Sequence, residues 1–293
     1  MDHVIGVDIG GSHITAAMVN AVNGRVLNES RSRSVVDAGA TAPTIISDWC
    51  KVIQSAAAAR LTNNLKIGIA MPGPFDYEEG ICLIKEQDKF RKLYRINLKL
   101  ELAKALSLPA DNLRFLNDAA SFLQGEVLYG AAAGASTALG ITLGTGLGSA
   151  IYTSGYATDA ELWKMPFKKG MAEDYLNTRW FVNEYKDLTG KDAAGVKELI
   201  TEATLSERTK IFEAFVKNLS RFLLTQLKKQ AVEKIVIGGN IAKASSHFFP
   251  LLKQALAQGG YTGEVTRGLL DEDAALIGAA GCWRLPVENL KAV

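Results

Sequence analysis

The stretch VIGVDIGGSHITAAMV, residues 4–19, decides the fold of this 293-residue chain. Apolar residues dominate positions 4–9, two glycines and a serine follow, and a second apolar run begins at Ile14. This pattern predicts strands over residues 4–9 and 14–20, joined by a tight turn. A hairpin needs the glycines, but it does not need the Asp8 carboxylate at the end of the first strand. Asp8 is therefore a candidate functional residue.

A second copy of this pattern occupies residues 138–153. Aligning the copies pairs Asp8 with Thr142, Gly10 with Gly144, Gly11 with Thr145, Ser12 with Gly146 and Thr15 with Ser149. Both read as strand, glycine turn and strand, which indicates either a duplicated unit or two ordinary hairpins. Glycine turns let the backbone approach a ligand, and two of them can clamp a polyphosphate. Neither copy is a P-loop or a dinucleotide fingerprint, because GxxxxGK[ST] is absent and a strand follows the second turn.

The rest of the chain predicts alternating helices and strands. Further strands are expected at about 25–29, at 67–70, in LRFLND (113–118) and in KIVIGGN (234–240). Helices are expected at about 44–61, 97–106, 119–128, 241–257 and 272–284, with a largely helical region at 160–229 and an irregular one at 76–96. Three strands followed by alternating elements indicate an α/β protein with mixed sheets.

The composition is that of an ordinary globular protein. The net charge is +2, with 48% hydrophobic and 22% charged residues, and the length allows two lobes. No basic stripe favours nucleic acid or an acidic membrane surface. The three cysteines, Cys50, Cys82 and Cys282, show no metal-site or disulfide spacing. No signal peptide and no apolar run of about 18 residues is evident, so we expect a soluble cytoplasmic protein.

An ordered set of motifs resembles the ROK family of sugar kinases and repressors, within the actin-like ATPase superfamily. The motifs are DIGGSHI, PGPFD, LNDAASFLQGE, LGTGLGSAI, IVIGGNIA and AALIGAAG. The resemblance spans essentially the whole chain. It implies a two-lobed actin-like (ribonuclease H-like) α/β fold, with ATP and sugar bound between the lobes. It places one lobe at residues 1–117, completed by a C-terminal helix at 272–293, and the other at 118–271. It also implies a homodimer.

The resemblance assigns roles by position. Asp118 would be the general base that takes the proton of the attacking sugar hydroxyl; the alternative is a helix N-cap. Asn117 would hold a neighbouring sugar hydroxyl, and Gly73 in PGPFD belongs to the sugar side. Asp8 would face Mg²⁺. The remaining nucleotide contacts would come from Gly10, Gly11 and Ser12 in the first turn, Gly144, Thr145 and Gly146 in the second, and Gly238 and Gly239 at the adenosine. His13 is interpreted as a structural turn residue.

The sequence departs from the family pattern in two regions. In DAELWKMPFKKGMAEDYLN, Glu161 and Glu173 match sugar-contacting glutamates, whereas Lys164 stands for the usual histidine. No cysteine follows, so the family's zinc site is not expected. In IKEQDKFRKLY, Gln87 and Asp88 are candidates for sugar binding, and we favour Asp88. The basic residues around Asp88 are Lys85, Lys89, Arg91 and Lys92, and they form either a solvated face or a site for an anionic phosphosugar.

Three functions are compatible with these motifs. The leading hypothesis is ATP-dependent phosphorylation of a hexose hydroxyl, glucose or a related sugar, with ATP and Mg²⁺. A transcriptional regulator is less favoured, because the first strand begins at Val4 and leaves no room for an N-terminal helix-turn-helix. A sugar-binding pseudokinase or chaperone-like ATPase stays open, because the zinc motif is missing. No nucleic acid or membrane partner is expected.

Overall fold

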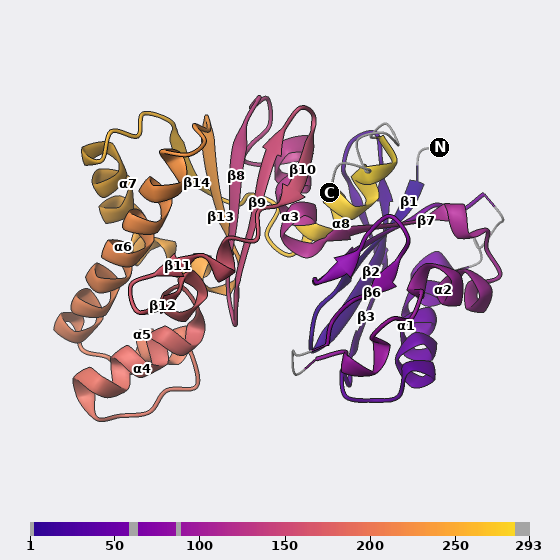
Figure 1. The fold of residues 1–293 in the computed structure, drawn as a ribbon, viewed down its shortest axis with the longest axis horizontal. Coiled ribbons are helices and arrows are strands. Elements are labelled where there is room, and N and C mark those ends of the chain that lie inside the picture. Colours follow the sequence, from indigo (N-terminus) through magenta and orange to yellow (C-terminus); the bar gives the residue numbers. More distant parts are fainter. Residues whose placement is uncertain (1–2, 59–63, 86–88, 285–293) are drawn as a thin grey trace.

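The computed structural model describes residues 3–58, 64–85 and 89–284, and it contains two five-stranded sheets side by side (Figure 1). The N-terminal sheet has the order β3-β2-β1-β4-β7, and the C-terminal sheet has the order β10-β9-β8-β13-β14. The first consists of β1 (His3–Ile9), β2 (His13–Asn20), β3 (Val26–Val35), β4 (Ile67–Met71) and β7 (Leu113–Asn117). The second consists of β8 (Ala138–Leu143), β9 (Leu147–Thr153), β10 (Tyr156–Asp159), β13 (Lys234–Gly238) and β14 (Glu264–Arg267).

The two sheets share one topology. In each, the first three strands form an antiparallel meander, and two later strands add in parallel beside the first. The equivalence favours a duplicated unit over two unrelated hairpins. The registers also correct the alignment of the two copies. Asp8 pairs with Thr15, but Thr142 pairs with Gly148, so the second turn is one residue shorter. Thr15 therefore corresponds to Gly148 and not to Ser149.

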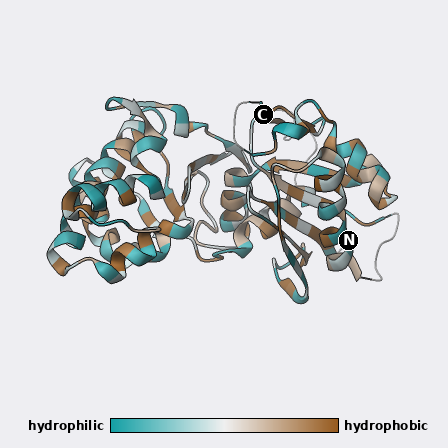
Figure 2. Ribbon diagram, turned by 90° about the horizontal axis from the view of Figure 1, so that it is seen from below, coloured by the Kyte–Doolittle hydropathy of each residue, from teal (hydrophilic) through white to brown (hydrophobic). Residues whose placement is uncertain are grey.

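Helices cover the outer face of each sheet with apolar side chains (Figure 1). In the N-terminal half, α1 (Ala42–Ala57) and α2 (Leu98–Leu106) contribute to a core in which Trp49 and Ile53 are fully buried. In the C-terminal half, α4 (Thr178–Thr189), α5 (Val196–Glu202), α6 (Leu205–Leu227) and α7 (Phe249–Gln258) form a core rich in phenylalanine. Figure 2 shows the pattern behind this packing, since these outer helices carry hydrophobic residues on one side and hydrophilic residues on the other.

Several segments differ from the sequence predictions. The helix predicted at 241–257 is two pieces, the 3₁₀ segment η6 (Asn240–His247) and α7, because Ala244 leaves helical geometry and Pro250 opens α7. The helical region predicted at 160–229 begins instead with η4 (Leu162–Lys164), the hairpin β11 (Pro166–Phe167) and β12 (Gly170–Met171), and η5 (Ala172–Tyr175). The irregular region 76–96 holds the short β5 (Phe75–Asp76), β6 (Ile81–Cys82) and η2 (Arg91–Leu93). The edge strands β10 and β14 were not predicted.

Two helices, α3 (Asp118–Tyr129) and α8 (Asp273–Gly281), lie between the sheets (Figure 1). They cross at glycines: a Cβ on Gly278 would lie 1.7 Å from the Ser121 carbonyl oxygen, and one on Gly125 would lie 2.2 Å from that of Ala274. On its other side, α8 presses its backbone against Gly68 of β4, where a Cβ would meet the Ala279 oxygen at 1.9 Å. The small residues of AALIGAAG therefore let one helix touch both α3 and the N-terminal sheet.

Candidate active site

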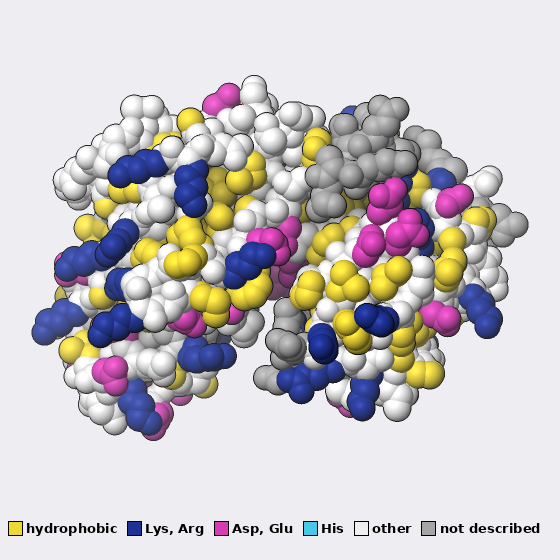
Figure 3. Space-filling view, in the orientation of Figure 1, with side chains coloured by type: hydrophobic (Ala, Val, Ile, Leu, Met, Phe, Trp, Pro, Cys, Tyr) yellow, Lys and Arg dark blue, Asp and Glu magenta, His cyan; other side chains and the backbone are white. Residues whose placement is uncertain are grey.

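An open groove separates the two halves (Figure 3). Residues of both halves line a cavity of about 230 Å³. The cavity brings together four of the sequence-predicted residues, Asp8, Asp118, Gly238 and Gly239. It is also lined by Thr142, which the alignment of the two copies pairs with Asp8. The other lining residues were not predicted from sequence, namely Phe122, Asn240, Ala242, Lys243, Arg267, Gly268, Asp271, Glu272 and Ala275. The wall thus combines the strand ends of both sheets with the segment that enters α8.

Asp8 stands near the carboxyl end of β1, the central strand of its sheet, and lines the cavity. Burial raises the pKa of Asp8 to about 6, with the Asp118 carboxylate adding to the rise, Arg33 opposing it and Glu272 contributing further. No cation among the described residues forms an ion pair with Asp8. Arg33 acts on Asp8 without forming an ion pair, so the half-buried carboxylate has no direct counterion among the described residues, which favours a bound cation.

Asp118 is the first residue of α3 and directly follows β7. The helix is capped by its neighbour: the Asn117 Oδ1 accepts hydrogen bonds from the amides of Ala119 at 2.8 Å and Ala120 at 3.0 Å. The alternative interpretation of Asp118 as the N-cap is therefore wrong. Among the described residues, the Asp118 carboxylate accepts one local hydrogen bond, from the Ala119 amide at 2.8 Å, and it lines the cavity.

The other end of the Asn117 side chain joins a polar cluster. Its Nδ2 donates to the Tyr77 hydroxyl at 3.2 Å and to the Asp159 Oδ2 at 3.0 Å. Tyr77 in turn donates to the Met71 carbonyl at 3.1 Å, and a Cβ on Gly73 would lie 3.2 Å from the Tyr77 hydroxyl. Burial raises the pKa of Tyr77 well above its usual range. Gly73 and Asn117, both predicted on the sugar side, thus share one cluster.

Sequence reasoning missed Tyr77 and Asp159. The only sequence signal for them is position, because Tyr77 follows PGPFD and Asp159 stands two residues before Glu161. Burial raises the pKa of Asp159 to about 6, the hydrogen bond from the Glu161 amide opposes the rise, and Asp118 adds to it.

This shift predicts a pH-dependent contribution to stability. Folded Asp159 holds its proton up to about pH 6, well above the pH at which an unperturbed aspartate ionises, so its contribution to the free energy of unfolding is lost as pH rises through about 6. Asp159→Asn cannot titrate, so its stability relative to wild type should improve between pH 4 and pH 7. Urea midpoints at several pH values measure this difference, with Asp111→Asn on an exposed position as the control. A difference independent of pH would contradict the assignment.

Each glycine turn is closed by a backbone hydrogen bond between near neighbours in sequence. The Gly10 amide donates to the His13 carbonyl at 2.8 Å, and the Gly144 amide donates to the Gly146 carbonyl at 3.0 Å. Residues outside the hairpin also make hydrogen bonds to the second turn. The Glu173 carboxylate accepts from the Leu147 amide at 2.9 Å, and Thr178 donates to the Gly144 carbonyl through both its amide and its hydroxyl, each at 2.8 Å. Glu173 therefore supports the second turn, and its predicted sugar contact stays a prediction.

Two glycines of the site should respond differently to alanine. A Cβ on Gly144 meets nothing within 4 Å, so Gly144→Ala should fold normally, whereas Gly239 has a φ of +85° and its Cβ would lie 2.4 Å from the Leu143 oxygen. Gly239→Ala should destabilise the protein by about 1–3 kcal/mol. If phosphate occupies the open space at Gly144, alanine there should raise KM for ATP without changing Tm. Unchanged KM would indicate that this turn does not approach the nucleotide.

The segment that departs from the family pattern contains an exposed ion pair. Lys164 donates to the Glu161 carboxylate at 2.7 Å, and both side chains are more than half exposed, so these two predicted sugar contacts face each other. Beside them, Trp163 and Met165 pack against the C-terminal core, and Phe167 is buried there. Among the described residues, no group of three or more His, Cys, Asp or Glu side chains could hold a metal ion. Asp88 lies outside the described residues.

The residues present fit a Mg²⁺ ion carried by a nucleotide. Mg²⁺ keeps several waters and is usually held by one or two carboxylates plus phosphate oxygens rather than by a cage of protein ligands. Asp8 is a single half-buried carboxylate with no cation partner among the described residues, and it lies in the same cavity as the second carboxylate, Asp118. When bound, the ion would supply charge neutralisation for the phosphates.

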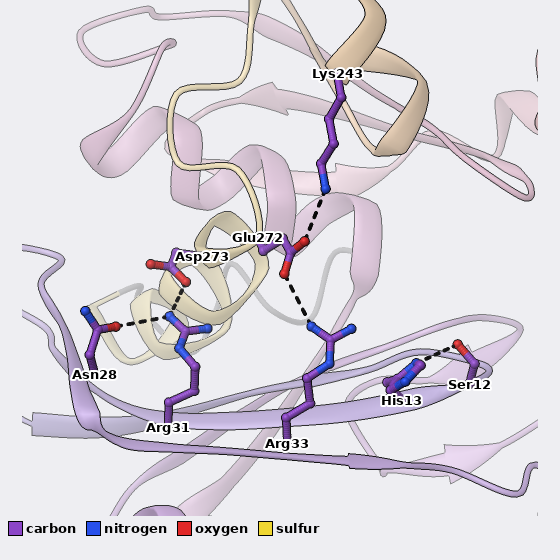
Figure 4. A network of polar contacts seen from close by, with 8 residues as sticks. All are labelled: Ser12, His13, Asn28, Arg31, Arg33, Lys243, Glu272 and Asp273. Atoms are coloured by element: carbon purple, nitrogen blue, oxygen red, sulfur yellow. Dashed lines mark hydrogen bonds and ion pairs between the residues drawn. The ribbon is translucent and has the colours of Figure 1, made fainter. Parts of the chain in front are cut away.

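Ion pairs at the mouth of the cavity connect the two halves (Figure 4). Glu272, just before α8, accepts from Lys243 of η6 at 3.2 Å and from Arg33 of β3 at 3.3 Å. Asp273, the next residue, pairs with Arg31 of β3 at 2.5 Å. The lysine comes from the C-terminal half and the arginines come from the N-terminal sheet, so the start of α8 is held from both sides.

The duplicated sheet topology, with α3 and α8 between the sheets and acidic strand ends in the cleft, defines an actin-like ATPase fold. The chain belongs to the ROK family, whose model matches residues 4–159, more than half of the chain.

Similar proteins support this assignment. A curated glucokinase from Thermotoga maritima is 27% identical, over 94% of this chain and 96% of that protein. A ROK hexokinase from Thermus thermophilus superposes with a TM-score of 0.79 at 20% identity, covering 98% of this chain and 99% of its own. A ROK family glucokinase from Streptomyces griseus, in complex with glucose and AMPPNP, gives 0.76 at 22% identity, covering 96% and 98%. Within the part of the chain that the structure describes, no helix is long and apolar enough to span a bilayer.

Proposed function

We propose that this protein is an ATP-dependent sugar kinase that phosphorylates a hydroxyl of glucose or a related hexose. One observation carries the proposal: Asp118 lines the same cavity as Asp8 and the Gly238-Gly239 turn, and its helix is capped by Asn117 instead. A carboxylate that is free of the capping role can accept the proton of an attacking hydroxyl. The relatives named glucokinase and hexokinase favour the same chemistry.

The residues divide into two regions of one groove. Asp8, the first turn (Gly10, Gly11 and Ser12), the second turn (Gly144, Thr145 and Gly146) and Gly238-Gly239 would hold ATP and its Mg²⁺. The sugar would lie toward Gly73, Tyr77 and Asp159, on the far side of Asp118 from the nucleotide. Phosphoryl transfer asks mainly for positioning and charge neutralisation, so one carboxylate suffices as base. We place the lobe boundary at residues 117 and 118, with the segment from residue 272 belonging to the first lobe.

Asn117 would act on the sugar chiefly through its neighbours. Its side-chain Oδ1 already caps α3, and its Nδ2 already donates hydrogen bonds to Tyr77 and Asp159. A half-buried Asp159 carboxylate, with hydrogen bonds from Asn117 and from the Glu161 amide, retains lone pairs for a sugar hydroxyl. We infer that Asp159 contributes to sugar binding, which the sequence did not predict.

The second candidate is a sugar-binding protein without phosphotransfer. The observation that keeps it open is the segment that departs from the family's kinase pattern, where Lys164 replaces the usual histidine and pairs with Glu161 at 2.7 Å. Loss of these contacts would weaken sugar binding, but it leaves Asp118 and the nucleotide cavity unchanged. We therefore rank the kinase first. A homodimer and a cytoplasmic location stay proposals that rest on the family resemblance.

A coupled assay of ADP formation across a panel of hexoses, N-acetylhexosamines and phosphosugars tests the proposal. We expect Mg²⁺-dependent ADP formation that requires one of these sugars. Calorimetric titration with the same panel gives the sugar affinity independently. Sugar binding without ADP formation would support the second candidate and overturn the first.

A further inference from the structure

Four of the described cations near the groove form ion pairs. Lys243 and Arg33 share Glu272, Arg267 pairs with Asp271, and Lys164 pairs with Glu161. A triphosphate and a transferring phosphoryl group nevertheless bring several negative charges into a site that already contains carboxylates. Transfer requires these charges to be neutralised, by metal ions or by side chains.

Lys89 lies directly on the first glycine turn. A Cβ built on Gly11 would lie 2.9 Å from the Lys89 Cδ and 3.9 Å from its Nζ, so the lysine stem crosses the Gly11 backbone with its ammonium close by. Among the described residues, no carboxylate forms an ion pair with Lys89. Its side chain is half-buried. Lys89 is therefore a cation held beside a candidate phosphate turn without a described acidic partner.

The next residue fixes this position. Phe90 is fully buried, its ring packs edge-on against Trp49 with centroids 5.5 Å apart, and its amide donates to the Ala38 carbonyl at 3.0 Å. Phe90 has a φ of 60°, an uncommon conformation for a bulky residue. Burial of Phe90 in the N-terminal core thus anchors the backbone from which Lys89 reaches Gly11.

We propose that Lys89 is a phosphate-binding residue of the first glycine turn, and that it contacts either the terminal phosphate of the nucleotide or the phosphate of a phosphosugar acceptor. The inference rests on the proposed kinase function and names a residue of its site. A lysine ammonium is a compact point charge on a flexible stem, which suits a phosphoryl group that moves during the reaction. A side chain at position 11 would displace the lysine stem from this turn.

The test compares ligands that differ in one phosphate. Affinities of wild type, Lys89→Met and Lys89→Arg are measured by calorimetry for Mg·AMPPNP, Mg·ADP and glucose 6-phosphate. If Lys89 contacts the nucleotide's terminal phosphate, Lys89→Met should weaken AMPPNP about 10- to 100-fold and change ADP less than about twofold. If it contacts an acceptor phosphate, only glucose 6-phosphate should weaken. Lys89→Arg should retain most of the affinity in either case.

Lys104→Met is the control, because Lys104 is an exposed lysine on α2, outside the basic segment around Asp88. It should leave all three affinities unchanged, and all variants should keep the wild-type Tm. Unchanged affinities in Lys89→Met, or equal losses for AMPPNP and ADP, would overturn the inference while leaving the kinase proposal intact. Failure of the wild-type protein to bind either nucleotide would instead overturn the proposed function, and the inference with it.

Discussion

Asp118→Asn is expected to lower kcat for sugar-dependent ADP formation by about 10²–10⁴-fold, the usual contribution of a general base. Asparagine keeps the size of the side chain but cannot accept the proton of the attacking hydroxyl. The fold should be retained, because the cap of α3 is Asn117 and not Asp118. Steady-state kinetics with the preferred hexose measure the effect, and calorimetry should show nearly unchanged sugar affinity.

Asp111→Asn is a suitable control for this variant. Asp111 is an exposed aspartate shortly before β7, outside the cavity, so the same chemical change should leave kcat at the wild-type value. Full activity in Asp118→Asn would rule out Asp118 as the base. Loss of sugar binding together with kcat would instead assign Asp118 to substrate positioning.

Gly278→Ala is expected to destabilise the protein by about 3 kcal/mol or more. The new methyl group would lie 1.7 Å from the Ser121 carbonyl oxygen, a backbone atom of α3 that cannot rotate away. Helix α8 would have to separate from α3, and α8 also contacts the N-terminal sheet, so tight packing on both sides leaves no room for relaxation. Urea unfolding of the purified variant, or its failure to accumulate as folded protein, measures the effect.

The direction of the expected stability change makes this prediction specific. Alanine has the higher helix propensity, so a glycine-to-alanine change inside an unpacked helix would stabilise by about 1 kcal/mol. Gly39→Ala provides the comparison, because its Cβ would make only an ordinary contact, with Asp37 Oδ1 at 3.4 Å, and should leave stability nearly unchanged. A stabilised Gly278→Ala would refute the close crossing of α3 and α8.

The duplicated hairpins could be predicted from sequence because their signals are local. Alternating apolar residues and glycine turns specify strand, turn and strand within a few positions. The register beyond the second turn could not be predicted, since a shortening by one residue leaves the pattern of letters almost unchanged. The break between η6 and α7 was signalled only by Pro250, and the edge strands β10 and β14 are too short to carry a strong pattern.

The residues of the candidate site also divide into those with a local sequence signal and those that only the structure revealed. Asp8 and Asp118 were visible in sequence because each stands where a strand ends, which is where α/β folds expose side chains to a crevice. Asp159, Tyr77 and Lys89 carry no such local mark. Asp159 and Tyr77 become candidates only because Asn117 donates hydrogen bonds to both. Lys89 is distinguished from the other basic residues around Asp88 only because its side chain crosses Gly11.

The sequence by itself determined the family, the two glycine hairpins and the carboxylates at the strand ends, because turn chemistry and hydrophobic periodicity act between near neighbours. Tertiary structure decided which of these groups meet. The packing of α8 between α3 and the N-terminal sheet sets the two sheets against each other, and that placement brings Asp8, Asp118 and Gly238 into one cavity. It also decided that Asn117 caps the helix, which leaves the neighbouring Asp118 carboxylate free to face the cleft.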